Sequence, residues 1–599
     1  MLIAAAFALV LSARTPQVCA QSASEASDTI HGTVVNAVTH EPIPRALVVS
    51  FDNRFATMTD SQGRFEFTFP KAEPPKPTPP GSSEGTLGEV MEGNAEDVSQ
   101  LNTVVIQPSE SNRPNGLSAR KPSFLEDDNT EPHLALAQNA KEVTLSLVPE
   151  AILAGQVSLP TSEAPDSIQL QLYRRQIQDG RAHWIPAGNA ASRSTGEFRF
   201  AELHAGTYKL LTRELLDRDP LTFDPRGQLF GYPPVYYQDA AGFDSATTIE
   251  LSAGQTAEAH ISLVKQPYYR VKIAVENMPP GFGTNVSVYS QGRSGPGYAL
   301  GYNQSTQSIE GMLPNGTYTV EANCIGQLGQ AALSGMMTLN IKGAAVDGAR
   351  LTLVPAGSVA INVKEEFGDK DPGGSTNFSD GKRSFVLRGP RRYLNVSLES
   401  ADDFVFARSG MLRSPKGPDD EALAIDNVQP GRYWVRVQSS RGYVASVRAG
   451  TTDLLHEPLT VGAGGADTPI EITMRDDTAT IDGKVEGVVP PPSSEAVLPP
   501  GPEESATVSL KSPPAHVYFI PLPDSGGEAA QISTAPDGTF SSQPLAPGEY
   551  RLLAFDREQR QLEYRNPQAM KSYGNMGPVV HVAGGQKEHV TLQLILASE

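Results

Sequence analysis

One short phrase recurs along the chain: an apolar segment, a loop containing glycine, and a strand that starts at a tyrosine. Its copies are LHAGTYKLL at 203–211, LPNGTYTVE at 313–321, VQPGRYWVR at 428–436 and LAPGEYRLL at 545–553. Successive tyrosines are 110, 115 and 117 residues apart. A repeat of that length corresponds to one small domain. The sequence therefore predicts a series of similar domains.

A second phrase, a short turn followed by alternating apolar and polar residues, closes each unit. Its copies are 139–148, 253–264, 343–354, 463–474 and 584–595. Alternation with period two is typical of a half-buried strand, and it places Val143, Leu145 and Leu147 on one face of the first copy. The next apolar strand follows with almost no linker, as in AILAGQV at 151–157. We expect stiff joints between units.

The residues of the glycine–tyrosine phrase are expected to be structural. Glycine suits a tight connection that a side chain would obstruct. The tyrosine ring fills core volume while its hydroxyl reaches a backbone partner, as in the tyrosine corner of other sandwiches. The residues concerned are Gly206, Gly316, Gly431 and Gly548, with Tyr208, Tyr318, Tyr433 and Tyr550.

The first unit contains HGTVVNAVTHEPIPRALVVS at 31–50 and FATMTDSQGRFEFTF at 55–69. It resembles the carboxypeptidase regulatory-like domain, a transthyretin-like or prealbumin-like β-sandwich. STGEFRF at 194–200 and APDGTFSS at 535–542 repeat part of that motif, whereas the third and fourth units keep only the two recurring phrases. The matching positions are Gly32, Val34, Pro42, Ile43, Ala46, Val48, Thr59, Asp60, Gly63, Phe65 and Phe67. The resemblance implies a non-catalytic accessory domain of the bacterial envelope, in a fold group that includes starch-binding-like sandwiches.

The fold class predicted is all-β, a tandem array of about five Ig-like or prealbumin-like sandwiches. The 54 glycines and 49 prolines among 599 residues, with only 7% aromatic residues, suit short strands and many turns. The expected domains are 21–149, 150–265, 266–355, 356–475 and 476–599. Two Pro-rich stretches, 71–112 and 488–506, have little to bury and are expected to be flexible insertions. LSARKPSFL at 117–125 should resume the first sandwich.

The N-terminal residues 1–20 are typical of a secretory signal peptide. MLIAAAFALVLSA at 1–13 is an apolar run of the right length, and Val18 and Ala20 favour cleavage before Gln21. A lipid-modified Cys19 is an alternative. After cleavage only Cys324 remains, so no intrachain disulfide is available and Cys324 is expected to be a small buried side chain. We expect a periplasmic, cell-surface or secreted protein without a later membrane helix.

Charge and motif spacing argue against several activities. A formal charge of −20 with no basic stripe disfavours nucleic acid. None of the ten histidines begins a zinc-protease spacing, and GSSEG at 81–85 lies in a Pro-rich tract rather than at a strand-to-helix turn. The stretch 365–381 contains Glu365, Asp369, Asp371 and Asp380 in no standard calcium register. We therefore predict no catalytic residues, no metal site and no cofactor.

One aromatic segment bears on ligand binding. LFGYPPVYYQD at 229–239 brings Phe230, Tyr232, Tyr236 and Tyr237 together, and exposed rings of this kind can stack on sugars. The alternative, which we favour, is that they fold back over the end of a sandwich. Trp184 and Trp434 are expected in cores.

The function predicted is a non-catalytic spacer and interaction module, with surface proteins as partners. The alternative is a carbohydrate-binding protein with polysaccharide as partner.

Overall fold

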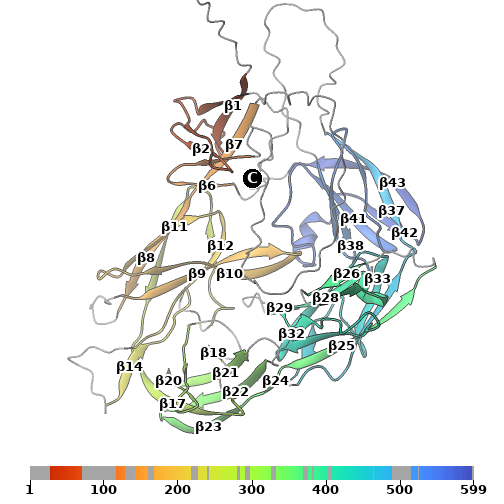
Figure 1. The fold of residues 1–599 in the computed structure, drawn as a ribbon. Coiled ribbons are helices and arrows are strands. Elements are labelled where there is room, and N and C mark those ends of the chain that lie inside the picture. The colour runs from red at the N-terminus through yellow and green to blue at the C-terminus, as the bar shows by residue number, and fades with distance from the viewer. Residues whose placement is uncertain are drawn as a thin grey trace, which may run out of the picture. The chain divides into compact units, whose positions relative to one another are not determined.

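A computed structural model describes residues 27–70, 116–127, 142–159, 167–216, 227–238, 240, 242–279, 283–290, 297–325, 332–368, 376–380, 383–401, 408–462, 464–488, 515–523 and 525–596. Within these ranges the regular elements are strands, apart from two 3-10 helices, η1 (Gly389–Arg392) and η2 (Ala569–Tyr573). The strands form a series of β-sandwiches, so the predicted all-β array is confirmed (Figure 1). The leader and both Pro-rich insertions, except Val488, lie outside the described residues.

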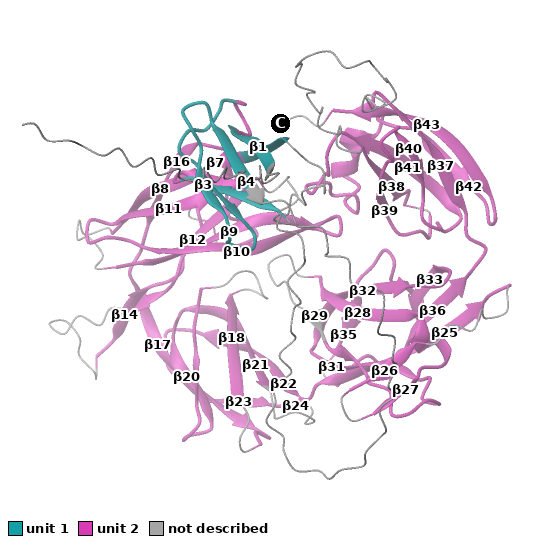
Figure 2. Cartoon of the chain, turned by 45° about the horizontal axis from the view of Figure 1, so that its top comes forward, with its two compact units in different colours: residues 1–35, 41–121, 130–146 teal, residues 36–40, 122–129, 147–599 magenta. Residues whose placement is uncertain are grey.

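The chain divides into two compact units. Unit 1 comprises residues 1–35, 41–121 and 130–146, and unit 2 comprises the remainder (Figure 2). Unit 1 holds the first sandwich, and unit 2 holds four more, which we number 2 to 5 in chain order.

Sandwich 1 is built from two small sheets. Strand β1 lies between β4 and β7, and β2 pairs with both β3 and β5. Ile30, Val48, Phe67 and Val143 are buried in its core. Strand β5 begins at Leu117, where the sandwich was expected to resume. The strands are β1 (Ser27–Asn36), β2 (Leu47–Ser50), β3 (Ala56–Met58), β4 (Arg64–Pro70), β5 (Leu117–Arg120) and β7 (Glu142–Pro149).

Sandwich 2 packs the sheet β10-β9-β12-β15 against β11-β8-β16. Leu153, Leu172, Phe200 and Tyr208 belong to its buried core. Within unit 2, β6 (Phe124–Glu126) pairs with the last residues of β7 just before this sandwich begins. Its strands are β8 (Ala151–Ser158), β9 (Gln169–Gln178), β10 (Arg181–Ala191), β11 (Glu197–Leu203), β12 (Gly206–Thr212), β15 (Ile249–Leu251) and β16 (Thr256–Ser262).

Sandwich 3 takes two strands from the sequence of its predecessor. β13 and β14 lie within the stretch 150–265, yet β14 pairs with β17 and extends the sheet of sandwich 3. The opposite sheet has the order β18-β21-β22-β24. The strands are β13 (Leu215–Leu216), β14 (Leu229–Tyr232), β17 (Gln266–Glu276), β18 (Gly283–Ser290), β19 (Gly301–Asn303), β20 (Ser308–Pro314), β21 (Gly316–Ile325), β22 (Leu333–Ile341), β23 (Val346–Thr352) and β24 (Val354–Pro355).

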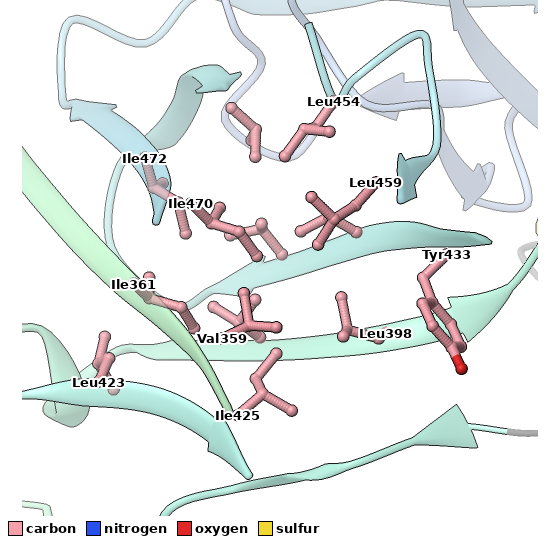
Figure 3. Packing of buried hydrophobic residues seen from close by; sticks show 14 of the residues in the cluster. Val359, Ile361, Leu398, Leu423, Ile425, Tyr433, Leu454, Leu459, Ile470 and Ile472 are labelled. Atoms are coloured by element: carbon pink, nitrogen blue, oxygen red, sulfur yellow. The ribbon is translucent and has the colours of Figure 1, made fainter. Parts of the chain in front are cut away.

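Sandwich 4 packs the sheet β30-β31-β25-β36-β33-β34 against β29-β28-β32-β35. Ile361, Leu398, Ile425 and Ile472 meet between the sheets, with Tyr433 at the margin of the group (Figure 3). The strands are β25 (Gly357–Glu366), β26 (Asn377–Ser379), β27 (Ser384–Val386), β28 (Leu394–Ser400), β29 (Arg408–Ser409), β30 (Met411–Leu412), β31 (Leu423–Val428), β32 (Gly431–Ser439), β33 (Tyr443–Ala449), β34 (Thr452–Asp453), β35 (Leu459–Val461) and β36 (Ile470–Arg475).

Sandwich 5 is one continuous path of strands, β39-β38-β41-β43-β37-β40, with β42 paired to β41. Phe519, Tyr550, Leu552 and Leu592 are buried in its core. The strands are β37 (Thr480–Glu486), β38 (His516–Pro521), β39 (Ala530–Ser533), β40 (Thr539–Ser541), β41 (Gly548–Phe555), β42 (Val579–Val582) and β43 (Lys587–Ile595).

The first and last strands of a sandwich lie side by side. β8 pairs in parallel with β16, β17 with β23, β25 with β36, and β37 with β43. Because the two strands are parallel, the closing strand ends beside the end of the opening strand, and the next opening strand follows within a few residues. β7 ends at Pro149 and β8 starts at Ala151, for example. Within unit 2, short connections of this kind restrict how far one sandwich can turn against the next.

Sandwiches 1, 2 and 5 share one local arrangement between the opening strand and a turn. The valine of a Gly-x-Val segment donates its backbone N–H to the carbonyl of a turn glycine: Val34 to Gly63, Val157 to Gly196 and Val485 to Gly538, at 2.8–2.9 Å. The phenylalanine two residues beyond each turn glycine covers the glycine of the opening strand. A Cβ atom on Gly155, for instance, would lie 2.7 Å from the Phe198 ring. These are the three units in which the motif is most complete.

Candidate functional site

The four repeat tyrosines make the same hydrogen bond. Each hydroxyl donates to the carbonyl four residues earlier: Tyr208 to His204 at 2.6 Å, Tyr318 to Pro314 at 3.0 Å, Tyr433 to Gln429 at 2.8 Å and Tyr550 to Ala546 at 2.8 Å. All four rings are buried. The hydroxyl thus fixes the loop that precedes the strand, which is the geometry of a tyrosine corner.

The glycine of the phrase leaves space for that tyrosine. A Cβ atom on Gly316 would lie 2.9 Å from the Tyr318 hydroxyl, and one on Gly431 would lie 2.9 Å from the Tyr433 hydroxyl. Any other residue would press on the oxygen that holds the loop. Glycine and tyrosine therefore act as a pair in sandwiches 3 and 4.

The aromatic segment of residues 229–239 does not form one exposed face. Phe230 lies on β14 and is 41% exposed, whereas Tyr236 is 3% exposed and packs with Tyr173, Leu211 and Phe243. Tyr232 and Tyr237 are half-buried against the core of sandwich 2. The structure therefore separates the four proposed sugar-contact residues and leaves Phe230 as the most exposed ring among them.

The other sequence candidates are placed as follows. Cys324 is buried, and burial raises the pKa of its thiol. Tyr393 donates a hydrogen bond to Glu365, and Arg383 pairs with Asp380, while Asp369 and Asp371 lie outside the described residues. Among the described residues, no group of three or more His, Cys, Asp or Glu side chains is arranged to hold a metal ion.

A group of residues that the sequence analysis did not single out gathers at the tip of the β9–β10 hairpin. Asp179 and Gly180 form its two-residue turn with φ angles of 48° and 71°, and Gln178 pairs with Arg181 across it. Positive φ at both central positions is typical of a type I′ turn, for which Asp-Gly is a preferred sequence. The tip thereby carries its side chains on a rigid two-stranded support.

The hairpin tip contacts sandwich 5. Gly180 lies on the ring of Tyr564, so a Cβ atom there would be 2.6 Å from the ring. Arg565 donates its backbone N–H to the Gly180 carbonyl and its Nε to the Asp179 carbonyl, both at 3.1 Å. Arg175, on β9, pairs with Glu563 at 2.6 Å.

The same tip contacts sandwich 4. The Arg181 guanidinium lies over the Trp434 ring, 3.5 Å from its centroid. Arg436, two residues further along β32, forms an ion pair with Asp179 and lies 3.3 Å from Glu399. We call the whole set the junction: Arg175, Asp179, Gly180, Arg181, Glu399, Trp434, Arg436, Glu563, Tyr564 and Arg565.

Trp434 corrects one expectation. It was expected in a core, but β32 buries Tyr433, Val435 and Val437, while Trp434 faces the other side of the sheet. Strand side chains alternate between faces, so a shift of one position moves a residue from the core to the surface. Trp184, by contrast, is half-buried against the cluster that contains Phe243.

The two arginines of the junction that contact sandwich 4 differ in how fully nearby acids offset the cost of burying their charge. Burial alone would lower the pKa of Arg436, but attraction to Asp179 and Glu399 outweighs it and raises that pKa. Burial, together with repulsion from Arg565 and Arg436, lowers the pKa of Arg181 to about 10. The Trp434 ring, whose face attracts cations, partly offsets that cost.

The Asp-Gly pair between two alternating segments was the available sequence signal for the hairpin. The sequence did not predict which residues the hairpin tip contacts, because those residues follow more than 200 positions later. The fold and junction together define a class: a protein of several β-sandwiches whose second sandwich is fastened to its fourth and fifth.

Comparison with known proteins adds little to that class. No family model matches the chain, and no curated protein matches it. Among solved structures it is similar to the Bacillus anthracis TIE protein, with 10% identity, a TM-score of 0.13, and coverage of 71% of this chain and 68% of the other.

Two further solved structures are similar to parts of the chain. A streptococcal ancillary pilin matches with 12% identity, a TM-score of 0.17 and coverage of 55% and 99%. The pilus adhesin SpaC from Lactobacillus rhamnosus GG matches with 11% identity, a TM-score of 0.14 and coverage of 55% and 43%. TM-scores this low carry no argument about fold or function. Within the described residues, no helix is long and apolar enough to cross a membrane.

Proposed function

We propose that this protein is an exported, non-catalytic scaffold whose β-sandwiches hold interaction surfaces at fixed positions in the periplasm, at the cell surface or outside the cell, with other surface proteins as partners. The junction carries the proposal. A protein that only needed length between two attachment points would gain nothing from joining residues 179 and 565, which are 386 positions apart. The junction fastens sandwich 2 to two later sandwiches, and that arrangement suits a scaffold.

We also propose that the chain has five domains, and that the first is of the carboxypeptidase regulatory-like type. Their boundaries are 21–149, 150–265, 266–355, 356–475 and 476–599. The valine–glycine hydrogen bonds and the phenylalanine over glycine in sandwiches 1, 2 and 5 support this, because they give the matching positions a shared structural reason. The carbohydrate alternative has less support, since Tyr236 is buried.

Substituting Gly180 tests whether the junction organises the scaffold. Gly180→Ala adds backbone strain and drives a Cβ atom into the Tyr564 ring, so amide exchange should speed up at both 179–181 and 563–566. Gly343→Ala is the matched control: its φ is also 71°, but its Cβ atom would meet only the Tyr269 hydroxyl at 3.9 Å. The readout is hydrogen–deuterium exchange of the full-length protein, and unchanged exchange at 563–566 in Gly180→Ala would remove the support for a fastened scaffold.

Export makes a separate prediction. When the gene is expressed in a bacterium, the mature protein should accumulate outside the cytoplasm and begin at Gln21, because Val18 and Ala20 favour cleavage there. Mass spectrometry of the N-terminal peptide checks it. A cytoplasmic protein that retains residues 1–20 would contradict the exported part of the proposal, and a lipid on Cys19 would replace cleavage before Gln21.

A further inference from the structure

A cavity of about 460 Å³ lies beside the junction, within unit 2. Three sandwiches line it: the hairpin supplies Arg181, sandwich 4 supplies Trp434, Leu455 and His456, and sandwich 5 supplies the remaining walls, including Arg551 and Tyr564. Its volume falls within the range of about 300–1,000 Å³ that is usual for small-molecule sites. The cavity exists only where the three sandwiches meet.

The cavity lining carries more positive than negative charge. Arg551 donates from Nη1 to the carbonyls of Gly574 at 2.7 Å and Met576 at 3.3 Å, and Arg565 donates to the Asp179 carbonyl. Carbonyl partners fix a guanidinium without neutralising its charge. Arg181 faces the Trp434 ring. The acid on the lining, Glu528, is attracted to Arg565 and to Arg436, so it offsets part of the charge of Arg565. Three arginines against one glutamate thus line a pocket of a chain whose formal charge is −20.

The rest of the lining is apolar or aromatic. Leu455 comes from sandwich 4, and Ile520, Leu522 and Met570 come from sandwich 5, beside the rings of Trp434 and Tyr564. Such a wall suits the flat apolar faces of a ring, while a guanidinium fork suits a carboxylate that accepts two parallel hydrogen bonds. The apolar wall and the arginines together favour a molecule that carries both a ring and a carboxylate.

We infer that the cavity beside the junction binds a small organic acid, a carboxylate carried on a six-membered ring. The ring is either aromatic, as in an aromatic acid, or a pyranose, as in a sugar acid. The carboxylate lies among Arg181, Arg551 and Arg565, and the ring lies against the apolar wall. This site goes beyond the scaffold role, which needs no ligand.

The test is calorimetric titration of the full-length mature protein with sodium benzoate and with sodium D-glucuronate, each paired with its uncharged counterpart, benzamide and D-glucose. At least one acid should bind with a Kd of about 1 mM or tighter, and its uncharged counterpart should bind at least tenfold more weakly. Binding of benzoate alone assigns an aromatic acid, and binding of glucuronate alone assigns a sugar acid. If neither acid binds, or if the neutral counterparts bind equally well, the inference is overturned.

Variants locate the binding. Arg181→Gln and Arg551→Gln should each weaken binding of the acid at least tenfold. Arg388→Gln is the control, because Arg388 is an exposed arginine of sandwich 4 that neither lines the cavity nor belongs to the junction. Arg181→Lys keeps a positive charge and should lose less than Arg181→Gln. Thermal unfolding of each variant shows that it is folded. Equal affinity in wild type, Arg181→Gln and Arg551→Gln would place the acid elsewhere and overturn the inference, while leaving the scaffold proposal to its own exchange experiment.

Discussion

At the scale of single residues, the corner tyrosines show why an identical residue recurs at intervals of more than a hundred positions. Each contributes a buried ring and one hydrogen bond to a carbonyl four residues before it. The ring alone is replaceable by phenylalanine, but the carbonyl is then left without its partner. A buried acceptor that loses its donor costs about 1–3 kcal/mol.

We therefore expect Tyr550→Phe to destabilise sandwich 5 by about 1–2 kcal/mol, because the Ala546 carbonyl loses its bond to the hydroxyl. Urea dependence of amide exchange in β41 measures this. Tyr237→Phe is the control: its hydroxyl accepts an exposed hydrogen bond from Gln238, and its loss should cost less than about 0.5 kcal/mol. Equal effects of the two substitutions would show that the corner bond has no special weight.

A second residue, Glu214, is held in an unfavourable setting between β12 and β13. One carboxyl oxygen accepts the Ala299 N–H at 2.8 Å, while the other is buried without a hydrogen-bond partner among the described residues. Burial raises the pKa of this carboxyl to about 7, against the lowering effects of the Ala299 N–H and Arg213. Tyr268, Tyr298 and Tyr318 are the other titratable groups that interact with it.

This pKa predicts the pH dependence of stability. Between about pH 4.5 and 7 the folded chain keeps a proton on Glu214 that the unfolded chain has lost, so stability from this group falls as pH rises through that window and is level above it. Glu214→Gln should remove that slope and stabilise the protein at pH 8 relative to wild type. Urea unfolding of both proteins at several pH values checks this, and identical slopes would contradict it.

At the scale of elements, the sequence predicted where strands lie better than it predicted which strands pair with each other. Alternation placed Val143, Leu145 and Leu147 on one face of β7, and all three are buried. Trp434 was expected in a core because it lies in a strand-like segment, but an aromatic residue in a strand is compatible with either face. The pairing of β14 with β17 was not predictable either, since its register depends on a strand in the next sandwich.

The contact of the hairpin with sandwich 5 predicts a measurable coupling. Arg175 and Glu563 are 33% and 12% exposed, so a double-mutant cycle with Arg175→Gln and Glu563→Gln should give a coupling of about 1 kcal/mol. Arg388 and Asp419 are as close, at 2.7 Å, but 65% and 80% exposed, and their cycle should give about zero. Unfolding free energies from urea titration provide both values; a coupling no larger at Arg175 than at Arg388 would argue against a fastened hairpin.

At the scale of the whole molecule, the sequence repeat predicted the number of sandwiches. It did not predict which sandwiches contact each other. The Asp-Gly turn indicates a hairpin from local sequence, but its partners Trp434 and Tyr564 lie in other repeats. Local patterns determine local structure, whereas contacts between distant segments depend on the final packing. The cavity beside the junction could not be predicted for the same reason.

A chain ending at residue 475 tests this dependence. It keeps Trp434 and Arg436 but lacks Tyr564 and Arg565, so the carbonyls of Asp179 and Gly180 lose their donors. Amide exchange at 176–184 should therefore speed up relative to the full-length protein, while β11 exchanges as before. Equal protection of 176–184 in both chains would show that sandwich 5 does not hold the hairpin.

The separation between Asp179 and Arg565 also orders events during biosynthesis. The hairpin leaves the ribosome 386 residues before the arginine that binds its turn. Until sandwich 5 has been synthesised, the carbonyls of Asp179 and Gly180 lack the two hydrogen bonds that Arg565 donates. The junction therefore forms only after residue 565 has been made, and a product that ends before it lacks the contacts between the hairpin and sandwich 5.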